Sequence, residues 1–167
     1  MNIVLCGMMG AGKTRIGKTL ATLTGKAFID TDELIVKNHG RIADIFANYG
    51  EKYFRDLETE TAEILSQKDE LIIATGGGFV LRERNASLLK QKGVLVYLKA
   101  DEQTLVQRLS ADTERPLLQN GELLNKIRSL LQERAPVYEK IADYTVCVDN
   151  QAVEEIAKEI IKKVNKK

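Results

Sequence analysis

The sequence predicts an α/β protein of three layers, in which a five-stranded parallel sheet is flanked by helices and extended by a helical insertion and a mobile lid. Two observations lead to this fold class. Short apolar runs alternate with amphipathic segments along the 167 residues, and a glycine-rich loop joins the first run to the first helical segment. Such alternation gives parallel strands joined by right-handed crossovers, and ligands bind at the carboxyl ends of those strands.

Each expected strand is a short apolar run. The first opens the chain, because Ile3–Cys6 is apolar throughout, as strands buried on both faces are. The same pattern gives the other four strands, which are Ala27–Asp30, Leu71–Ala74, Val94–Leu98 and Tyr144–Val148.

The segments between these runs have the period of amphipathic helices. After the glycine-rich loop, Ile16, Leu20 and Leu23 recur at helical spacing. The clearest helix is the last, in which one apolar stripe lies opposite charged residues. This stripe consists of Val153, Ile156, Ala157, Ile160, Ile161 and Val164.

The length favours a single domain with one core. We assign residues 1–30, 71–110 and 123–167 to that core. Residues 31–70 then form an insertion of two or three helices between the second and third strands, where we expect substrate to bind. Residues 111–122 are polar and lack periodicity, which predicts a mobile lid.

Composition argues against several function classes. The formal net charge is +1 without a basic block, so nothing indicates a nucleic-acid partner. No apolar run has the length of a membrane span, and the chain begins with a strand rather than a signal peptide. Cys6 and Cys147 lie in apolar runs without metal-binding spacing, which favours buried, reduced thiols. We therefore expect a cytoplasmic monomer that acts on small molecules and contacts no membrane.

The loop Gly7–Thr14 fits the pattern G-x-x-x-x-G-K-[ST] between a strand and a helix. Glycines let backbone N–H groups turn inward around an anion, and the following helix N-terminus adds positive charge. Lys13 would reach the β- and γ-phosphates, and the Thr14 hydroxyl would hold Mg²⁺. The sequence therefore predicts binding of a nucleoside triphosphate. We expect its contacts at Gly10, Ala11, Gly12, Lys13, Thr14 and Arg15.

Two aspartates lie at the end of the second expected strand, in the sequence Asp30-Thr31-Asp32. Alternation along an extended backbone puts both carboxylates on one side, facing the cleft. Asp30 would then face the metal through water, and Asp32 would orient or deprotonate an acceptor hydroxyl. Thr31 or Asp32 could instead cap the helix that follows. The two interpretations are compatible.

Three arginines are candidates for anion binding. Arg55 has Glu51 and Glu58 at helical spacing, so it forms either a surface ion pair, which sequence alone favours, or a clamp for a planar anion. Arg115, before a proline in the expected lid, would neutralise charge on a transferring phosphoryl group or lie free on the surface. Arg134 lies on the apolar side of a helix, where a charge needs a partner, so we expect it to face an anion.

Three consecutive glycines, Gly76, Gly77 and Gly78, follow the third expected strand. Glycines lose much conformational entropy on folding, so we expect them to serve close approach of the backbone to a ligand. A purely structural turn is the alternative. Their position places them between the nucleotide and a second substrate.

Taken together, these residues resemble the shikimate kinase family over nearly the whole chain. The P-loop is common to many nucleotide-binding proteins, whereas the combination of the other motifs is specific. The matching motifs are Gly7–Thr14, Asp30-Thr31-Asp32, Ile42–Phe46, Gly50-Glu51, Phe54-Arg55, Thr75–Gly78, Arg115–Leu118 and Arg134–Tyr138.

The resemblance implies a three-layer P-loop kinase fold and transfer of the γ-phosphoryl group of ATP to the 3-hydroxyl of shikimate. It also implies that Arg55 and Arg134 hold the shikimate carboxylate. Asp32 and Gly77 would hold its hydroxyls, and Gly76 and Gly78 would belong to the same substrate site. The catalytic residues that the resemblance implies are Asp32, Lys13 and Arg115. Thr14 would bind Mg²⁺, with Asp30 in the outer coordination shell.

The loop after the last expected strand departs from the family pattern, because Val148–Ala152 has no proline. We assign Gln151 and Arg108 to the adenine on this weaker basis. A nucleoside monophosphate kinase is disfavoured, because several arginines in the insertion would be needed to hold the phosphate of the acceptor nucleotide. The insertion offers only Arg41 and Arg55. A sugar-acid kinase acting on gluconate is harder to separate by chemistry alone. A GTPase switch would need an N-K-x-D motif, which the sequence lacks. A catalytically dead binder should have lost Lys13, Asp32 or one of the arginines, and all of them are present.

Overall fold

A parallel five-stranded sheet forms the centre of the computed structural model, which describes residues 1–111 and 120–166. The strand order is β2-β3-β1-β4-β5, and every pairing is parallel, which confirms the expected fold class. All five predicted runs form strands, with ends that differ by one residue at most. The strands are β1 (Asn2–Cys6), β2 (Ala27–Asp30), β3 (Leu71–Ala74), β4 (Gly93–Lys99) and β5 (Tyr144–Cys147).

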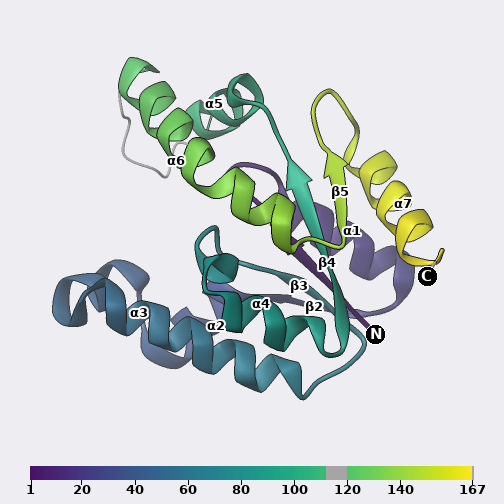
Figure 1. Cartoon of the computed structure of the whole chain (residues 1–167), viewed down its shortest axis with the longest axis horizontal. Helices are drawn as coiled ribbons and strands as arrows, with labels where there is room; N and C mark the ends of the chain where they lie inside the picture. The colour runs from purple at the N-terminus through teal and green to yellow at the C-terminus, as the bar shows by residue number, and fades with distance from the viewer. Residues whose placement is uncertain (112–119, 167) are drawn as a thin grey trace.

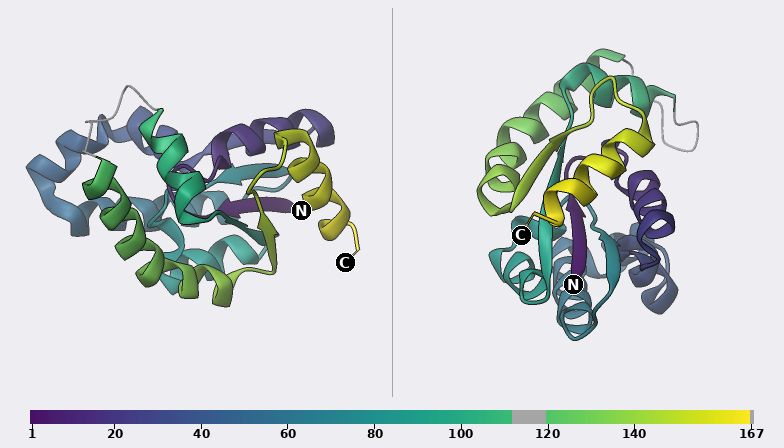
Figure 2. Two further views of the ribbon diagram at one scale, coloured as in Figure 1. Left: turned by 90° about the horizontal axis from the view of Figure 1, so that it is seen from above. Right: turned by 90° about the vertical axis from the view of Figure 1, so that its right-hand side faces the viewer.

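Helices cover both faces of this sheet, as Figures 1 and 2 show. On one face α1 packs against α7, while α4 and α6 lie on the other face against β4, and α3 packs outside α4. The helices are α1 (Lys13–Thr24), α2 (Thr31–His39), α3 (Ile42–Ser66), the 3-10 turn η1 (Phe79–Leu81), α4 (Glu83–Lys90), α5 (Glu102–Ser110), α6 (Asn120–Ile141) and α7 (Val153–Val164).

The core lies on the central strands. All five residues of β1 and all four of β3 are buried, because helices cover them from both sides. A second, smaller cluster lies in the insertion and joins α2 to α3. It consists of Ile35, Ile45, Phe54 and Leu57, with Ile42 packed against it.

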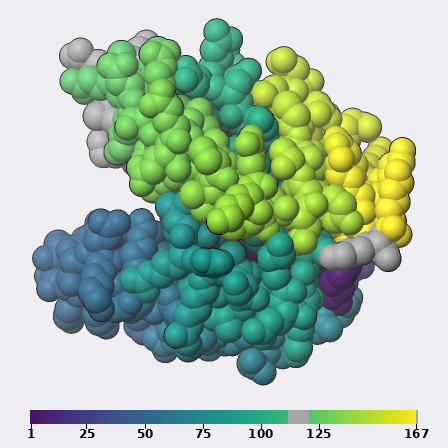
Figure 3. All heavy atoms as spheres, in the orientation of Figure 1, coloured from purple at the N-terminus to yellow at the C-terminus, as the bar shows by residue number. Residues whose placement is uncertain are grey.

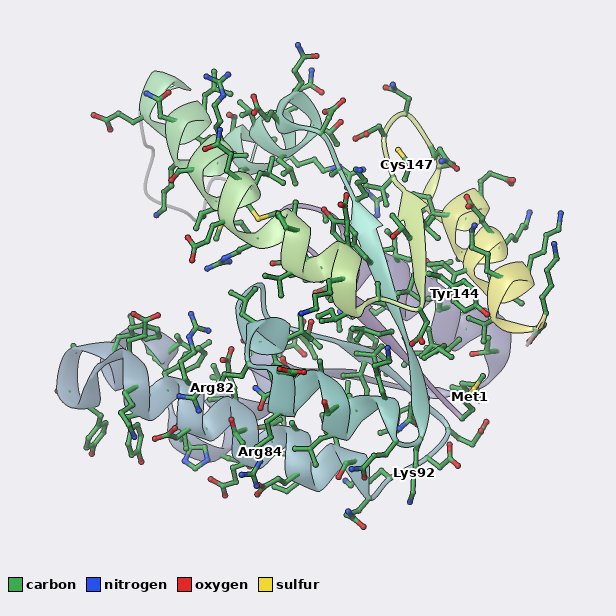
Figure 4. All side chains as sticks on the ribbon, viewed as in Figure 1. Met1, Arg82, Arg84, Lys92, Tyr144 and Cys147 are labelled. Atoms are coloured by element: carbon green, nitrogen blue, oxygen red, sulfur yellow. The ribbon has the colours of Figure 1, made fainter. Side chains whose placement is uncertain are left out.

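The insertion is attached to the segment that follows the glycine triplet. Arg82, just after η1, donates to Asp56 at 2.8 Å and to Thr59 at 3.2 Å, and Arg84 pairs with Glu63. Figure 4 shows both arginines directed toward α3. These contacts hold the second half of α3 beside the carboxyl end of β3.

Three sequence expectations need correction or completion. Of the expected lid, residues 112–119 lie outside the described part of the chain, while Asn120 already begins α6. The insertion is interrupted at Gly50, whose φ of 84° breaks the helical path within α3. Cys147 is exposed rather than buried, because β5 is an edge strand with one face open.

Among the described residues, no helix has the length and apolar character needed to cross a membrane.

Candidate active site

The glycine-rich loop lies at the carboxyl end of the central strand β1. Gly10 and Gly12 have φ angles of 84° and 92°, a conformation that L side chains rarely adopt, so the path requires glycine there. Gly12 caps α1 without a side-chain hydrogen bond, and the first helical turn has no acidic residue. The unpaired N–H groups and the positive end of α1 therefore meet at the loop, as phosphate binding requires.

Lys13 is the cation of this loop. Its Nζ donates to the carbonyl oxygens of Gly7 at 2.7 Å and Met8 at 2.9 Å. These two bonds hold the ammonium group against the start of the loop. One positive charge therefore lies at the loop where phosphate binding is predicted.

Opposing influences act on the protonation state of Lys13. Burial lowers the pKa of Lys13 to about 8, and Arg134 acts in the same direction, whereas the carboxylates of Asp32 and Asp30 favour the charged form. The influence of all three groups indicates that residues from β2, α2 and α6 converge on the loop. A phosphate group at the loop would raise the pKa of Lys13 again.

Thr14 and Asp30 form the pair expected for a metal. The Thr14 hydroxyl donates to Asp30 Oδ2 at 2.9 Å, which brings a hydroxyl and a carboxylate together beside the loop. Oxygen ligands of this kind suit Mg²⁺, which is usually bound by few protein groups together with phosphates and water. No cluster of three or more acidic, histidine or cysteine residues that could hold a metal occurs in the described ranges, and a Mg²⁺-nucleotide site does not need one.

Asp30 and Asp32 reach the cleft by a different route from the one expected. The alternation argument is wrong, because Thr31 already begins α2 and Asp32 lies in its first turn. Asp30 is the cap of that helix, since its Oδ1 accepts from the N–H groups of Asp32 at 3.0 Å and Glu33 at 3.2 Å. Neither Thr31 nor Asp32 is the cap. One carboxylate thus both starts α2 and contacts Thr14.

The glycine triplet is the point where three charged side chains meet. A Cβ atom on Gly76 would lie 2.7 Å from Asp32 Oδ1, and one on Gly77 would lie 3.0 Å from an Arg134 guanidinium nitrogen. At Gly78 the added atom would lie 2.7 Å from the Arg55 Cζ atom. The absence of side chains therefore makes room for one carboxylate and two guanidinium groups. A turn with a purely structural role, the alternative for these glycines, would not account for the meeting of three charged side chains.

Arg55 is held by acidic neighbours on its own helix. It donates to both oxygens of Glu58, at 3.1 and 3.0 Å, and more loosely to Glu51 at 3.4 Å. Glu58 is only 2% exposed, and its burial raises its pKa, which Arg55 opposes. The ion pair is therefore internal, unlike the surface pair that sequence alone favoured. It fixes a guanidinium group beside Gly78.

Arg134 approaches the same loop from α6, on the opposite side of the cleft. Its Nε atom is buried and has no hydrogen-bond partner within the described residues. An unpaired buried guanidinium N–H is costly, so this atom marks a place where an anion would bind favourably. Figure 3 shows the open cleft between α6 and the insertion. Arg134 and Arg55 thus face the glycine loop from two sides of one cleft.

A pocket of about 450 Å³ lies on the other side of the P-loop. Arg108 forms part of its wall and donates to the carbonyl oxygens of Gly10 at 3.3 Å and Ala11 at 2.9 Å. Gln151 also lines the pocket, and its side chain donates to the Cys147 carbonyl at 2.7 Å. The complete lining is Gly12, Arg15, Ile16, Arg108, Gln151, Ala152, Val153, Glu154 and Ile156.

Two further residues complete the description of the site, one predicted from sequence and one not. Arg115 lies outside the described residues. Tyr138, to which the sequence analysis gave no role of its own, is fully buried and donates from its hydroxyl to the Gly77 carbonyl at 2.5 Å. Its position four residues after Arg134, on the same face of α6, is the signal that links it to the cleft.

The family comparison agrees with this geometry. A family model described as shikimate kinase matches residues 9–165. A shikimate kinase from Thermodesulfovibrio yellowstonii is 46% identical over 162 residues, covering 96% of this chain and 93% of that protein. Another, from Caldanaerobacter subterraneus subsp. tengcongensis, is 44% identical over 162 residues and covers 96% and 94% of the two chains.

A solved structure is similar over the same extent. The shikimate kinase from Acinetobacter baumannii in complex with shikimate superposes with a TM-score of 0.90 and 39% identity. The superposition covers 99% of this chain and 93% of that one.

Nucleotide binding should be accompanied by proton uptake at mildly alkaline pH. Because the pKa of Lys13 is about 8, close to half of the molecules carry a neutral Lys13 at that pH, and bound phosphate favours the charged form. Calorimetric titration of MgATP in buffers of different ionisation enthalpy should show uptake of about half a proton at pH 8. Near pH 6, where Lys13 is already charged, this contribution should vanish. Equal proton uptake at both pH values would contradict the assignment.

Proposed function

The chain belongs to the shikimate kinase family, and from this membership we propose how its cleft carries out the reaction. It is an ATP-dependent kinase that transfers the γ-phosphoryl group of ATP to the 3-hydroxyl of shikimate, giving shikimate 3-phosphate and ADP in aromatic amino acid biosynthesis. The observation that carries the proposed site is the meeting of Asp32, Arg134 and Arg55 at three consecutive glycines.

The two guanidinium groups bind the shikimate carboxylate. Arg55 is oriented by buried Glu58, and Arg134 has an unpaired Nε atom, so both present donors without a further rearrangement. A planar fork of N–H groups suits bidentate contact with a carboxylate. The backbone of Gly76, Gly77 and Gly78 lines the same space and contacts the ring. The acid is thereby held at one end of the cleft.

The hydroxyl end of shikimate meets Asp32. This carboxylate lies beside Gly76 and is close enough to Lys13 to influence its pKa. It therefore stands between the acceptor site and the phosphate loop, where it accepts the hydrogen bond of the 3-hydroxyl and directs its oxygen toward the γ-phosphorus. Positioning of this kind accounts for much of the catalysis in phosphoryl transfer.

The phosphates of ATP occupy the P-loop. Its contacts are the backbone of Gly10, Ala11 and Gly12, with Lys13 at the transferring group and Thr14 at the metal. Positive charge at this place stabilises the phosphoryl oxygens as charge develops on them. Arg115 from the lid adds a second positive charge as a catalytic residue. The adenosine end extends into the pocket lined by Arg15, Arg108 and Gln151.

Mg²⁺ is the proposed metal, held by the Thr14 hydroxyl with Asp30 in the outer shell. When bound, it neutralises charge on the phosphates. The protein's own contribution is to keep the two oxygen ligands together, since Asp30 is fixed by capping α2. A cytoplasmic, single-domain monomer without a nucleic-acid or membrane partner remains part of the proposal. The free Cys6 and Cys147 fit a reducing compartment, and a net charge of +1 offers no strong attraction to nucleic acid.

The reaction is tested by an assay that couples ADP release to a spectroscopic signal. Shikimate, gluconate and CMP are offered in parallel at equal concentration, with MgATP. ADP release should depend on shikimate, and gluconate and CMP should give only the background rate. Faster turnover of gluconate would instead identify a sugar-acid kinase, and turnover of CMP would identify a nucleotide kinase.

Replacement of Asp32 should impair chemistry more than nucleotide binding. We expect Asp32→Asn to lower kcat by about 100-fold or more, because loss of an acid–base or orienting group has effects of that order. The affinity for MgATP should stay within about twofold of the wild-type value. The neighbouring, exposed Glu33→Gln is the matched control and should retain activity. Near-normal kcat in Asp32→Asn would refute the role of Asp32.

Truncation of Arg134 should weaken shikimate binding. Arg134→Ala should cost about 2–5 kcal/mol of binding free energy, the range for losing one member of a desolvated charge pair. Arg128→Ala is the control on the same helix, because Arg128 pairs with Glu102 at the surface and is 49% exposed. Calorimetric titration with shikimate measures both variants. Unchanged affinity in Arg134→Ala would show that the carboxylate binds elsewhere.

A further inference from the structure

We propose that Tyr138 is a positioning residue that fixes the orientation of the glycine loop toward the acceptor and so sets the affinity for shikimate. This inference rests on the proposed binding of shikimate at Gly76–Gly78. Tyr138 itself touches neither substrate in this assignment. It acts through the Gly77 carbonyl, to which its hydroxyl donates at 2.5 Å.

Tyr138 is held firmly on its own side of this bond. Its side chain is fully buried, and its ring packs at a tilt against Tyr97 with 5.1 Å between the ring centroids. Burial raises the pKa of Tyr138, although the neighbouring Arg134 guanidinium group acts in the opposite direction, so the phenol stays protonated and remains a hydrogen-bond donor. A rigid donor aimed at one backbone oxygen can define the direction of that peptide group.

The loop needs such a constraint only at its centre. Its start is held to the sheet and the insertion, because the Thr75 hydroxyl donates to the Leu5 carbonyl and the Gly76 N–H donates to Thr31 Oγ1, both at 3.0 Å. Its end is held where the Phe79 N–H donates to the Gly76 carbonyl at 3.1 Å. Tyr138 contacts the peptide group between these two anchors.

That central peptide joins Gly77 to Gly78, and neither residue has a Cβ atom to limit its backbone rotation. The peptide group is planar and trans, so the Gly77 carbonyl and the Gly78 N–H point in opposite directions. By holding the carbonyl toward α6, Tyr138 also fixes the direction of the Gly78 N–H. Without the hydroxyl, this peptide could rotate at little cost and the loop would lose its preformed shape.

The same bond couples the loop to the carboxylate-binding arginine. Arg134 lies four residues before Tyr138, on the same face of α6, and its guanidinium group approaches Gly77. Two side chains of one helix therefore contact one glycine. Tyr138 sets the spacing between that helix and the loop, and hence the width of the space between Arg134 and the backbone.

The test compares Tyr138→Phe with Tyr97→Phe. The first removes the hydroxyl but keeps the buried ring, and the second removes a hydroxyl from the partner ring without touching Gly77. We expect Tyr138→Phe to raise the KM for shikimate about tenfold, as the loss of one hydrogen bond of typical strength would, with the KM for ATP unchanged within about twofold. Tyr97→Phe should leave both constants close to wild type.

A second measurement separates positioning from general stability. Amide hydrogen exchange should become faster at Gly76 and Phe79 in Tyr138→Phe, because their N–H groups donate within the anchored loop, whereas the P-loop amides should exchange as in the wild type. A lower melting temperature with unchanged KM for shikimate would overturn the proposal, as would an equal rise in both KM values. The wild-type enzyme is assayed alongside, and failure to phosphorylate shikimate would refute the proposed function and this inference with it.

Discussion

The acceptor side of the cleft depends on a stretch of backbone without side chains. At Gly76, Gly77 and Gly78 the space that Cβ atoms would fill is taken by Asp32, Arg134 and Arg55 respectively. These three groups come from separate elements, so the loop is their common reference point. Any added side chain would displace a charged group from the cleft, and the geometry of the site would change with it.

The site also depends on how charge is distributed around this loop. Lys13, Arg55 and Arg134 bring three positive charges to a partly buried cleft, where each would repel the others. Buried Glu58 compensates Arg55 locally, whereas the carboxylates near Lys13 only partly offset its desolvation. Arg134 differs from the other two cations, because its buried Nε atom has no hydrogen-bond partner among the described residues and is therefore the donor left for an anion.

Much of this arrangement follows from sequence, and the exceptions have physical reasons. The strands were predictable because buried parallel strands are continuous apolar runs, and the P-loop because its pattern is strict. The route of Asp32 into the cleft was not, since one capping side chain at Asp30 turned an expected strand end into a helix start. Tyr138 was missed because a buried tyrosine gives the same apolar signal whether or not its hydroxyl holds a distant carbonyl. Arg115 lies outside the described residues and stays a prediction.

The small hydrophobic cluster of the insertion has a consequence for how such enzymes diversify. Ile35, Ile45, Phe54 and Leu57 are packed among themselves and not within the main core. The first part of the insertion therefore has a small interior of its own, whereas Ala62 and Leu65 in the second half of α3 join the main core. An exchange of that segment would have to keep the start of α2, because Asp30 caps this helix and also accepts the hydrogen bond of Thr14 beside the nucleotide loop.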